Sequence, residues 1–476
     1  MGDAQDEAPL YEALSRAAGV QAFWLHVPAH RQKAPRGGDV LQGAYHLDLT
    51  ELPGLDDLHC PRGAIERAQA LAARAYGADR TFFLVNGSTG GLLALILAAL
   101  TPGQQLVLPR NIHRSVMAAV IFSGADPVWV DPVYLADFNL TGGMRPQALH
   151  QALTQARPGA VLTVHPTYFG LAGDLKGLVK VAHEAGWPVI VDEAHGAHLR
   201  FHPALLADAM ACGADASVQS THKTGGALTQ ASMLHLKEGL LDTGRLMSAL
   251  NLGQTTSPSF PLLASLDLAR RNLVREGRAR LEEILSMAAV LRQRLAGCAG
   301  LAVLGPGDVP GGFLDPTRVV VSTRGTGLTG YEVAHILWER YSVRVELATP
   351  DLILAILGIG TAREDGLGLA TALEDICVRE GRKTSGLSPV VWPPRPAKRL
   401  APREAWFAGR RRVALAGAAG LVSAELIAVH PPGLVVICPG EEITPEVVEY
   451  LIQVRRLGLS VHGAADPALG TVRVVD

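Results

Sequence analysis

Short apolar segments that alternate with helix-like segments constrain the fold of this chain more than any other feature. The clearest apolar segments have the length of buried strands and lie at 81–85, 105–109, 128–131, 160–165 and 189–192. Helix-like stretches follow several of them, for example at 173–186. Strands that alternate with helices pair in parallel, with helices on both faces of the sheet. The sequence therefore predicts an α/β fold with a mostly parallel sheet, which holds ligands beyond the carboxyl ends of its strands.

Two of the predicted strands end in residues that carry chemistry. The strand 189–192 delivers Asp192 and then His195, and a short β-branched run precedes His222 and Lys223. An aspartate can keep a pyridinium nitrogen protonated, and a lysine amine can carry an aldehyde as a Schiff base. These residues therefore suit an enzyme that uses pyridoxal 5′-phosphate (PLP).

Each of these strings taken alone has other interpretations. A Ser-x-His-Lys string is more often an ordinary loop end. The Asp-Glu-Ala-His string resembles the magnesium-binding box of helicases, but the sequence has no G-x-x-x-x-G-K-[ST] phosphate loop. His195 and His198 are candidate zinc ligands, but the helical H-E-x-x-H spacing is missing. We therefore expect no metal site.

A phosphate site is predicted where the strand 81–85 enters a loop at 86–91 and then a helix that runs to Leu100. The first turn of a helix presents free N–H groups, and a glycine such as Gly90 allows an anion to approach closely. Ser88 and Thr89 add hydroxyl donors. The phosphate of PLP would fit this loop, although a plain helix cap explains the loop alone equally well.

The rest of the chain reads as further helices and strands. We expect helices at 64–76, 204–212, 261–297, 330–341 and 445–457. We expect strands at 231–236, 318–322, 343–347, 434–438 and 472–475. The segment 231–236 alternates like a strand at the edge of a sheet.

These elements predict several domains. They are an N-terminal arm (1–45), a large PLP-binding domain (46–300), a small α/β domain (301–384), a proline-rich linker (385–402) and a C-terminal α+β domain (403–476). An arm of this kind needs a surface to dock on, so we expect it to lie across a partner subunit.

Composition excludes several classes of function. The 43 Lys and Arg residues nearly balance the 45 Asp and Glu residues, so no strongly basic surface invites nucleic acid. The longest apolar run, Gly91 to Leu100, is too short to span a bilayer. The acidic N-terminus lacks the pattern of a secretory signal. The five cysteines are scattered and never spaced C-x-x-C, so we expect buried free thiols in a reducing cytoplasm.

Many short strings then point to one family. They include Leu-Pro-Gly-Leu-Asp-Asp-Leu-His (52–59), Phe-Leu-Val-Asn-Gly-Ser-Thr-Gly-Gly (83–91), Pro-Arg-Asn-Ile-His-Arg-Ser (109–115), His-Pro-Thr-Tyr-Phe-Gly (165–170), Val-Asp-Glu-Ala-His-Gly-Ala-His (191–198), Gln-Ser-Thr-His-Lys-Thr (219–224) and Pro-Gly-Glu (439–441). In this order they resemble the fold-type-I, aspartate-aminotransferase-like decarboxylases of ornithine, lysine and arginine, in their short bacterial form. The likeness runs from about residue 24 to the end of the chain.

The resemblance implies a role for each candidate site residue. Lys223 would carry PLP as a Schiff base, Asp192 would pair with the ring nitrogen, and His113 would stack on the ring. His195 and His222 would lie near the substrate α-carbon or carboxylate. The other cofactor contacts would come from Ser88, Thr89, Gly90, Thr167 and Ser220, and from Thr256 and Ser257 toward the phosphate of the neighbouring subunit. Such enzymes work as homodimers or as multiples of dimers, such as dimers of dimers, with active sites at the interface.

Two features depart from the family. Ala29 stands where the family usually has glycine after a proline, so the conformation of the arm can differ. The larger acid-induced relatives begin with a response-regulator-like domain, which we do not expect here. Their decameric assembly is therefore not carried over.

The implied reaction is decarboxylation of a basic L-amino acid to a di- or polyamine, which would serve polyamine supply. A cationic side chain needs a carboxylate, and Glu346 is our first candidate, followed by Asp48 or Glu51 of the other subunit. For each of these residues, a solvated surface carboxylate is the more common interpretation. The sequence does not choose between lysine, ornithine and arginine. The alternatives are an aminotransferase or other Cα lyase, or a non-catalytic PLP-binding homologue.

Overall fold

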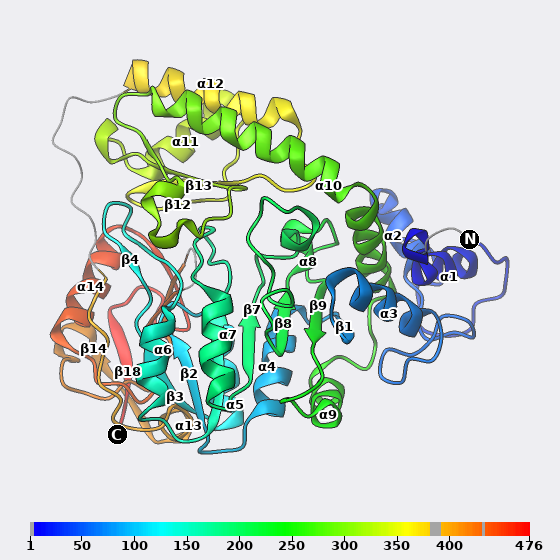
Figure 1. The fold of residues 1–476 in the computed structure, drawn as a ribbon, viewed down its shortest axis with the longest axis horizontal. Helices are drawn as coiled ribbons and strands as arrows, with labels where there is room; N and C mark the ends of the chain where they lie inside the picture. Colours follow the sequence, from blue (N-terminus) through cyan, green and yellow to red (C-terminus); the bar gives the residue numbers. More distant parts are fainter. Residues whose placement is uncertain (1–3, 381–391, 431–433) are drawn as a thin grey trace. The chain divides into compact units, whose positions relative to one another are not determined.

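The computed structural model describes residues 4–380, 392–430 and 434–476 (Figure 1). The chain divides into two compact units. The first unit comprises residues 1–98, 188–282 and 358–360. The second unit comprises residues 99–187, 283–357 and 361–476. The long helix α10 (Phe260–Ala296) contributes residues to both units.

Four strands form the sheet of the first unit. Strands β7 (Val189–Asp192) and β8 (Ala216–Gln219) are parallel, and β9 (Ser232–Leu236) pairs antiparallel with β8. Strand β1 (Arg80–Leu84) then pairs antiparallel with β9. Because β9 has a neighbour on each side and all five of its residues are buried, the prediction of an edge strand is wrong.

Helix α4 (Gly87–Ala99) covers one face of this sheet. It begins earlier than the sequence predicted, so all residues of the expected loop at 86–91 except Asn86 belong to the start of the helix. A side chain at Gly91 would place its Cβ 2.6 Å from Leu84 and 3.0 Å from Val218. Glycine is therefore what allows the start of this helix to lie directly on the strands.

The opposite face is covered by α3 (Ala64–Tyr76), whose bounds match the prediction. Helix α1 (Pro9–Ala18), from the predicted arm, packs Leu10 and Leu14 into the same core as Phe260. The arm beyond α1 exposes apolar side chains, with Phe23 99% exposed. Its contact with a partner subunit stays a prediction.

The helix expected at 204–212 is replaced by turns. The Ala209 N–H donates to the Glu193 carboxyl group at 2.7 Å, and the Ala211 N–H donates to Asp208 at 3.1 Å. Side-chain oxygens thus take the donors that a helix would direct to its own carbonyl groups. The apolar spacing of this segment could not reveal a partner at position 193.

The second unit contains the other parallel strands. Strand β2 (Gln105–Pro109) pairs in parallel with β3 (Asp126–Val130) and with β6 (Gly159–Val164). The helices α5 (Arg114–Ser123), α6 (Pro146–Leu153) and α7 (Leu175–Glu184) alternate with these strands along the chain. The parallel pairs in both units confirm the predicted α/β class with mostly parallel strands.

An antiparallel sheet follows in the order β10-β11-β13-β12. Its strands are Ala302–Val303, Arg318–Ser322, Leu352–Ile356 and Leu347–Ala348, and its helices are α11 (Gly330–Tyr341) and α12 (Arg363–Glu380). The strand expected at 343–347 is almost absent, because regular pairing begins only at Leu347. Strand β13 was not predicted.

The C-terminal part of the second unit mixes helices and short sheets, as predicted for 403–476. Its helices are α13 (Pro402–Phe407) and α14 (Pro445–Arg456). Its strands are β14 (Arg410–Ala414) with β18 (Thr471–Val475), and β16 (Leu434–Ile437), β15 (Ile427–His430) and β17 (Ser460–His462). Pro402, the last residue of the predicted linker, is the first residue of α13, and positions 385–391 of that linker lie outside the described residues.

The cysteines and helices bear on two further predictions. All five cysteines are free, but only Cys438 is buried and Cys60 is exposed, so the expectation of buried thiols is wrong for most of them. Within the described ranges, no helix combines the length and apolarity that crossing a membrane requires.

A buried ion pair attaches the C-terminal part to the end of β2. Both guanidinium ends of Arg110 donate to the Glu441 carboxylate, at 2.6 and 2.8 Å, and Arg110 lies 4.7 Å from the ring centroid of Trp129. Glu441 also accepts the N–H of Cys438 at 2.8 Å. Burial shields both charges from water, so each depends on the other for compensation.

Glu441→Gln is therefore expected to lower the free energy of unfolding by about 3–5 kcal/mol, because it leaves the Arg110 charge buried without a counterion. Urea unfolding followed by circular dichroism measures this change. The control is Glu442→Gln, whose ion pair with Arg399 is largely exposed and is worth about 1 kcal/mol or less. Equal losses in the two variants would contradict this account.

Candidate active site

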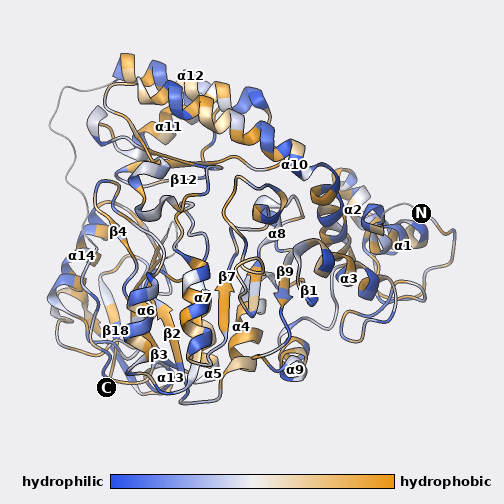
Figure 2. Ribbon diagram, viewed as in Figure 1, coloured by the Kyte–Doolittle hydropathy of each residue, from blue (hydrophilic) through white to orange (hydrophobic). Residues whose placement is uncertain are grey.

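The predicted catalytic residues of the first unit gather where β7 and β8 end. Figure 2 shows β7 as an apolar strand, and Asp192 is its last residue. Strand β8 leads through Ser220 into the single turn α8 (Thr221–Thr224), which carries Lys223. The two strands are parallel and Asp192 pairs in register with Val218, so these residues emerge from the same edge of the sheet.

Lys223 and His195 contact each other directly. The Lys223 Nζ lies 2.9 Å from the His195 Nε2. Asp192 is buried beside them, and burial raises its pKa, while Lys223 and the Ala194 N–H favour the charged form. Burial disfavours the charged form of this carboxylate. An additional cationic N–H partner would stabilise that charged form.

His222 is held as a neutral ring. Its Nδ1 lies 3.0 Å from the Ala231 carbonyl oxygen, and because a carbonyl only accepts, this nitrogen carries the proton. Burial lowers the pKa of His222, and Lys223 lowers it further, although the bond to Ala231 opposes both. The other ring nitrogen therefore keeps its lone pair for accepting a proton.

Three hydroxyl groups meet beside the start of α4. The Ser88 hydroxyl lies 2.7 Å from that of Ser220 and 3.3 Å from that of Ser232. Ser88 and Ser220 were predicted, whereas Ser232 was missed. Its position became visible only through the register of β9, in which Ser232 pairs with Leu84.

The first turn of α4 also holds the two remaining phosphate candidates. Thr89 is exposed there, and Gly90 follows it. The hydroxyl groups and the free N–H groups of a helix N-terminus together form a surface that accepts an anion.

Other predicted residues of the first unit make local contacts. Thr256 and Ser257 lie in an exposed loop. Asp48 pairs with His30 at 3.1 Å, and Glu51 accepts a hydrogen bond from the hydroxyl of Thr50. Their proposed action across a subunit interface stays a prediction.

Three predicted residues belong to the second unit. His113 caps α5, and its Nδ1 lies 2.8 Å from the Ser115 hydroxyl. Thr167 is buried, and its hydroxyl accepts the Leu171 N–H at 3.1 Å. Glu346 accepts a hydrogen bond from the Tyr168 hydroxyl. The roles of all three toward the cofactor and substrate stay predictions.

The residues of the first unit fit PLP. A phosphate ester matches the three hydroxyl groups and the N–H groups of α4. A protonated ring nitrogen matches the buried carboxylate of Asp192, whose pKa is raised by burial in the absence of such a partner. An aldehyde matches the amine of Lys223. Within the described residues, no group of His, Cys, Asp and Glu side chains is arranged to hold a metal ion.

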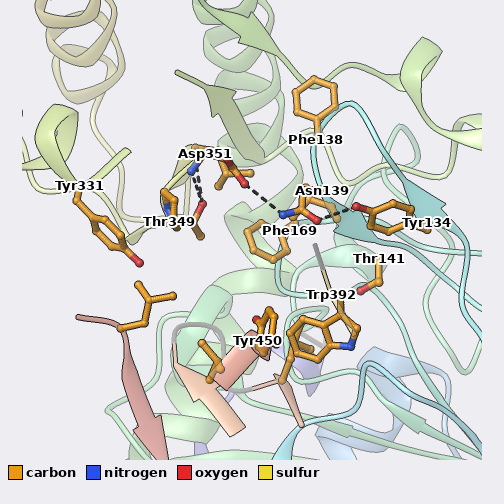
Figure 3. Close-up of a pocket in the computed structure, with 16 residues that line it drawn as sticks. Tyr134, Phe138, Asn139, Thr141, Phe169, Tyr331, Thr349, Asp351, Trp392 and Tyr450 are labelled. Atoms are coloured by element: carbon orange, nitrogen blue, oxygen red, sulfur yellow. Dashed lines mark hydrogen bonds between the residues drawn. The ribbon is translucent and has the colours of Figure 1, made fainter. Parts of the chain in front are cut away.

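The second unit contains an aromatic pocket (Figure 3). Its aromatic lining consists of Tyr134, Phe138, Phe169, Tyr331, Trp392 and Tyr450. The polar side chains bind one another: the Tyr134 hydroxyl donates to Asn139 at 2.8 Å, and Asn139 donates to Asp351 at 3.2 Å. None of the residues that line this pocket was predicted to hold the cofactor or the substrate.

Comparisons with known proteins identify the family of this chain. The family model described as Orn/Lys/Arg decarboxylase, major domain, matches residues 8–365, and the model of the C-terminal domain of that family matches residues 392–472. An arginine decarboxylase of Bacillus subtilis is 39% identical and covers 99% of this chain and 98% of its own length. An arginine decarboxylase of Bacillus anthracis is 37% identical, with the same coverage.

A solved structure shows the same fold. The crystal structure of a lysine decarboxylase of Francisella novicida superposes with a TM-score of 0.84, covers 98% of this chain and 81% of its own, and is 19% identical. Because identity is this low, the likeness speaks for the architecture alone.

The hydroxyl cluster leads to a prediction about binding. Ser220→Ala should raise the dissociation constant of PLP by roughly 10- to 100-fold, because a hydrogen bond to a charged phosphate is worth about 1.5–3 kcal/mol. Titration of the apoprotein with PLP, followed by absorbance, measures this constant. Ser248→Ala on the exposed surface of α9 (Thr243–Gly253) is the control and should bind as the wild type does. Unchanged binding by the Ser220 variant would exclude this serine from the phosphate site.

Proposed function

The chain belongs to the Orn/Lys/Arg decarboxylase family and is a decarboxylase of a basic amino acid, and we propose that it uses PLP at Lys223 to convert arginine into the corresponding amine. One observation supports the site above all others: the Lys223 amine contacts His195 at 2.9 Å, beside the buried Asp192. The arginine decarboxylases among its relatives, which align over almost the entire chain, support arginine over lysine or ornithine.

When bound, PLP supplies an aldehyde for the substrate amine and a ring that accepts the electron pair left behind as CO₂ departs. Asp192 would hold the proton on the ring nitrogen. The aspartate would act electrostatically, since its fixed negative charge beside that proton would keep the ring nitrogen protonated and so make the ring a better electron acceptor. A buried carboxylate performs this task better than an exposed one, because water does not screen it.

Two histidines would move protons around Lys223. The Lys223 amine must lose a proton before it can react as a nucleophile, and His195 lies at hydrogen-bond distance to accept that proton. His222 is neutral and keeps the lone pair on its Nε2, because its Nδ1 bonds the Ala231 carbonyl. Lys223 would then return a proton to the substrate α-carbon, or His222 would do so after accepting a proton at its Nε2.

Glu346 is our candidate for the guanidinium end of the substrate. A carboxylate can accept two parallel hydrogen bonds from a guanidinium group. The Tyr168 hydroxyl donates to Glu346 and would fix its orientation. Asp48 or Glu51 of a second subunit are the alternatives for this role.

The remaining proposals concern assembly and location. We propose a homodimer, or a dimer of dimers, in which His113 stacks on the cofactor ring and Thr256 and Ser257 reach the phosphate of the neighbouring subunit. We also propose that the enzyme acts in the cytoplasm and contributes to polyamine supply.

The cofactor assignment predicts the behaviour of one variant. Lys223→Ala should lower CO₂ release by about a thousandfold or more, because it removes the group that holds the aldehyde and moves protons. Manometric or radiometric CO₂ release from arginine measures this loss. Lys237→Ala, which removes only a surface pair with Asp79, is the matched control and should retain activity. Full activity of the Lys223 variant would refute the assignment.

The substrate assignment predicts an order of rates. Arginine should be decarboxylated with a kcat/KM about tenfold or more above that of lysine or ornithine, because a pocket built for a guanidinium leaves hydrogen-bonding groups unpaired with a shorter amine. Glu346→Gln should raise the KM for arginine and reduce this preference. A wild-type enzyme that prefers lysine, or a Glu346 variant with unchanged selectivity, would contradict the respective proposal.

A further inference from the structure

Glu193 follows Asp192 directly but lies on the other face of the sheet. Successive residues of a strand point to opposite faces. Asp192 shares its face with Val218, against which α4 packs, whereas Glu193 faces the side covered by α3. The Glu193 side chain is 0% exposed and therefore cannot reach a substrate.

Glu193 binds two segments that are distant in sequence. One of its carboxyl oxygens accepts the Ala209 N–H at 2.7 Å, and the other accepts the side-chain amide of Gln219 at 2.8 Å. Its own N–H continues the pairing of β7 with β8 by donating to the Val218 carbonyl at 3.0 Å. Gln219 is the last residue of β8, immediately before the turn that leads to Lys223.

This contact is the first of a row that crosses all four strands of the first unit. The Gln219 side-chain oxygen accepts from the Nε2 of His235 on β9 at 3.1 Å. The Nδ1 of His235 then lies 2.8 Å from the Thr81 hydroxyl on β1. His235 is neutral, because burial lowers its pKa to about 3, so its Nδ1 accepts from Thr81. Every member of the row is buried.

The charged groups around Glu193 disfavour its ionised form. Burial, as the largest cause, and the neighbouring Asp208 raise the pKa of Glu193, while hydrogen bonds from Gln219, Ala209 and Ser217 lower it, and the net result is a pKa of about 8. Arg200 lies 3.4 Å from Asp208 and offsets part of that charge. Tyr76, which stacks on His235 at 4.3 Å, stays neutral because burial raises its pKa strongly; Arg270 acts on that tyrosine in the opposite direction. Burial and Asp208 thus favour the protonated form of Glu193.

We propose that Glu193 is a positioning residue: by holding Gln219 and Ala209 on the hidden face of the sheet, it fixes the end of β7 against the end of β8 and so sets the placement of Asp192 relative to Lys223. The inference rests on the proposed function, because it concerns the two residues assigned to PLP. A buried network in which every group has a partner gives such rigidity, since each member restricts the next.

The test compares variants of Glu193 as PLP-loaded enzymes. Glu193→Ala should raise the dissociation constant of PLP roughly tenfold and shift the pH midpoint of the visible cofactor absorbance by about one unit, because the Asp192 and Lys223 groups that set this midpoint lose their fixed separation. Glu193→Gln should give wild-type values, since it keeps the shape and neutrality of the protonated acid. The amide of Gln219 can reverse its direction, and the neutral His235 can then carry its proton on Nδ1 and accept from Gln219 at Nε2.

Thr81→Val is the matched control. It breaks the row at its far end on β1 and leaves both Glu193 contacts in place, so it should lower the melting temperature without moving the absorbance midpoint. Should Glu193→Ala fail to fold, Glu193→Asp is the deciding variant. The aspartate side chain is one methylene shorter and cannot reach Gln219, so the pH midpoint of the absorbance should shift by the same amount. A folded Ala or Asp variant with the wild-type midpoint, or a Thr81 variant with an equal shift, overturns the inference.

The protonation of Glu193 has a separate readout. A pKa raised above its ordinary value of 4.5 means that folded Glu193 keeps a proton that the unfolded state releases. The protonated side chain therefore contributes fully to stability below pH 4.5, and this contribution is lost as the pH rises to about 8. Wild-type apoenzyme should therefore lose melting temperature between pH 5 and pH 8 relative to Glu193→Gln. A parallel dependence in both proteins would overturn the protonated state. If wild-type holoenzyme shows no visible absorbance at all, the proposed function fails instead.

Discussion

The parallel pairing of β7 with β8 is the constraint on which the site depends. It places two chain segments about thirty residues apart side by side, with both carboxyl ends at one edge of the sheet. Asp192 leaves one strand there, and Lys223 follows the other. A buried carboxylate and an amine are thereby brought close together although they are distant in sequence. The 2.9 Å contact between Lys223 and His195 is a consequence of that pairing.

The two faces of this sheet carry different groups of polar residues. One face holds Asp192 and the hydroxyl groups of Ser88 and Ser220, which would contact the proposed cofactor, and Gly91 allows α4 to lie close to the strands there. The other face hides a row of polar side chains that bind one another and, through Glu193, the N–H of Ala209. Because burial is unfavourable for polar groups that lack partners, such a row forms only when each group is satisfied, and a satisfied row holds its strands in register.

Local patterns predicted what depends on local sequence. The bounds of α3, the strands β2, β7 and β11, and the strand-end positions of Asp192 and Lys223 follow from apolar runs and glycine signals. Two predictions were wrong because a segment bonds to a residue or strand that is distant in sequence. The segment 204–212 is not a helix because Glu193 takes one of its N–H groups, and β9 is internal because β1 pairs with it. The partnership of Arg110 with Glu441 joins two motifs that the sequence offered only as separate strings.

The central claim is that the chain binds PLP covalently through one particular lysine. Reduction of the wild-type holoenzyme with borohydride, followed by proteolysis and mass spectrometry of the peptides, tests it most directly. The account predicts a pyridoxyl group on the peptide that contains Ser220 to Thr224, attached at Lys223. A pyridoxyl group on another lysine, or an unlabelled Lys223 in an enzyme that still decarboxylates arginine, would contradict it.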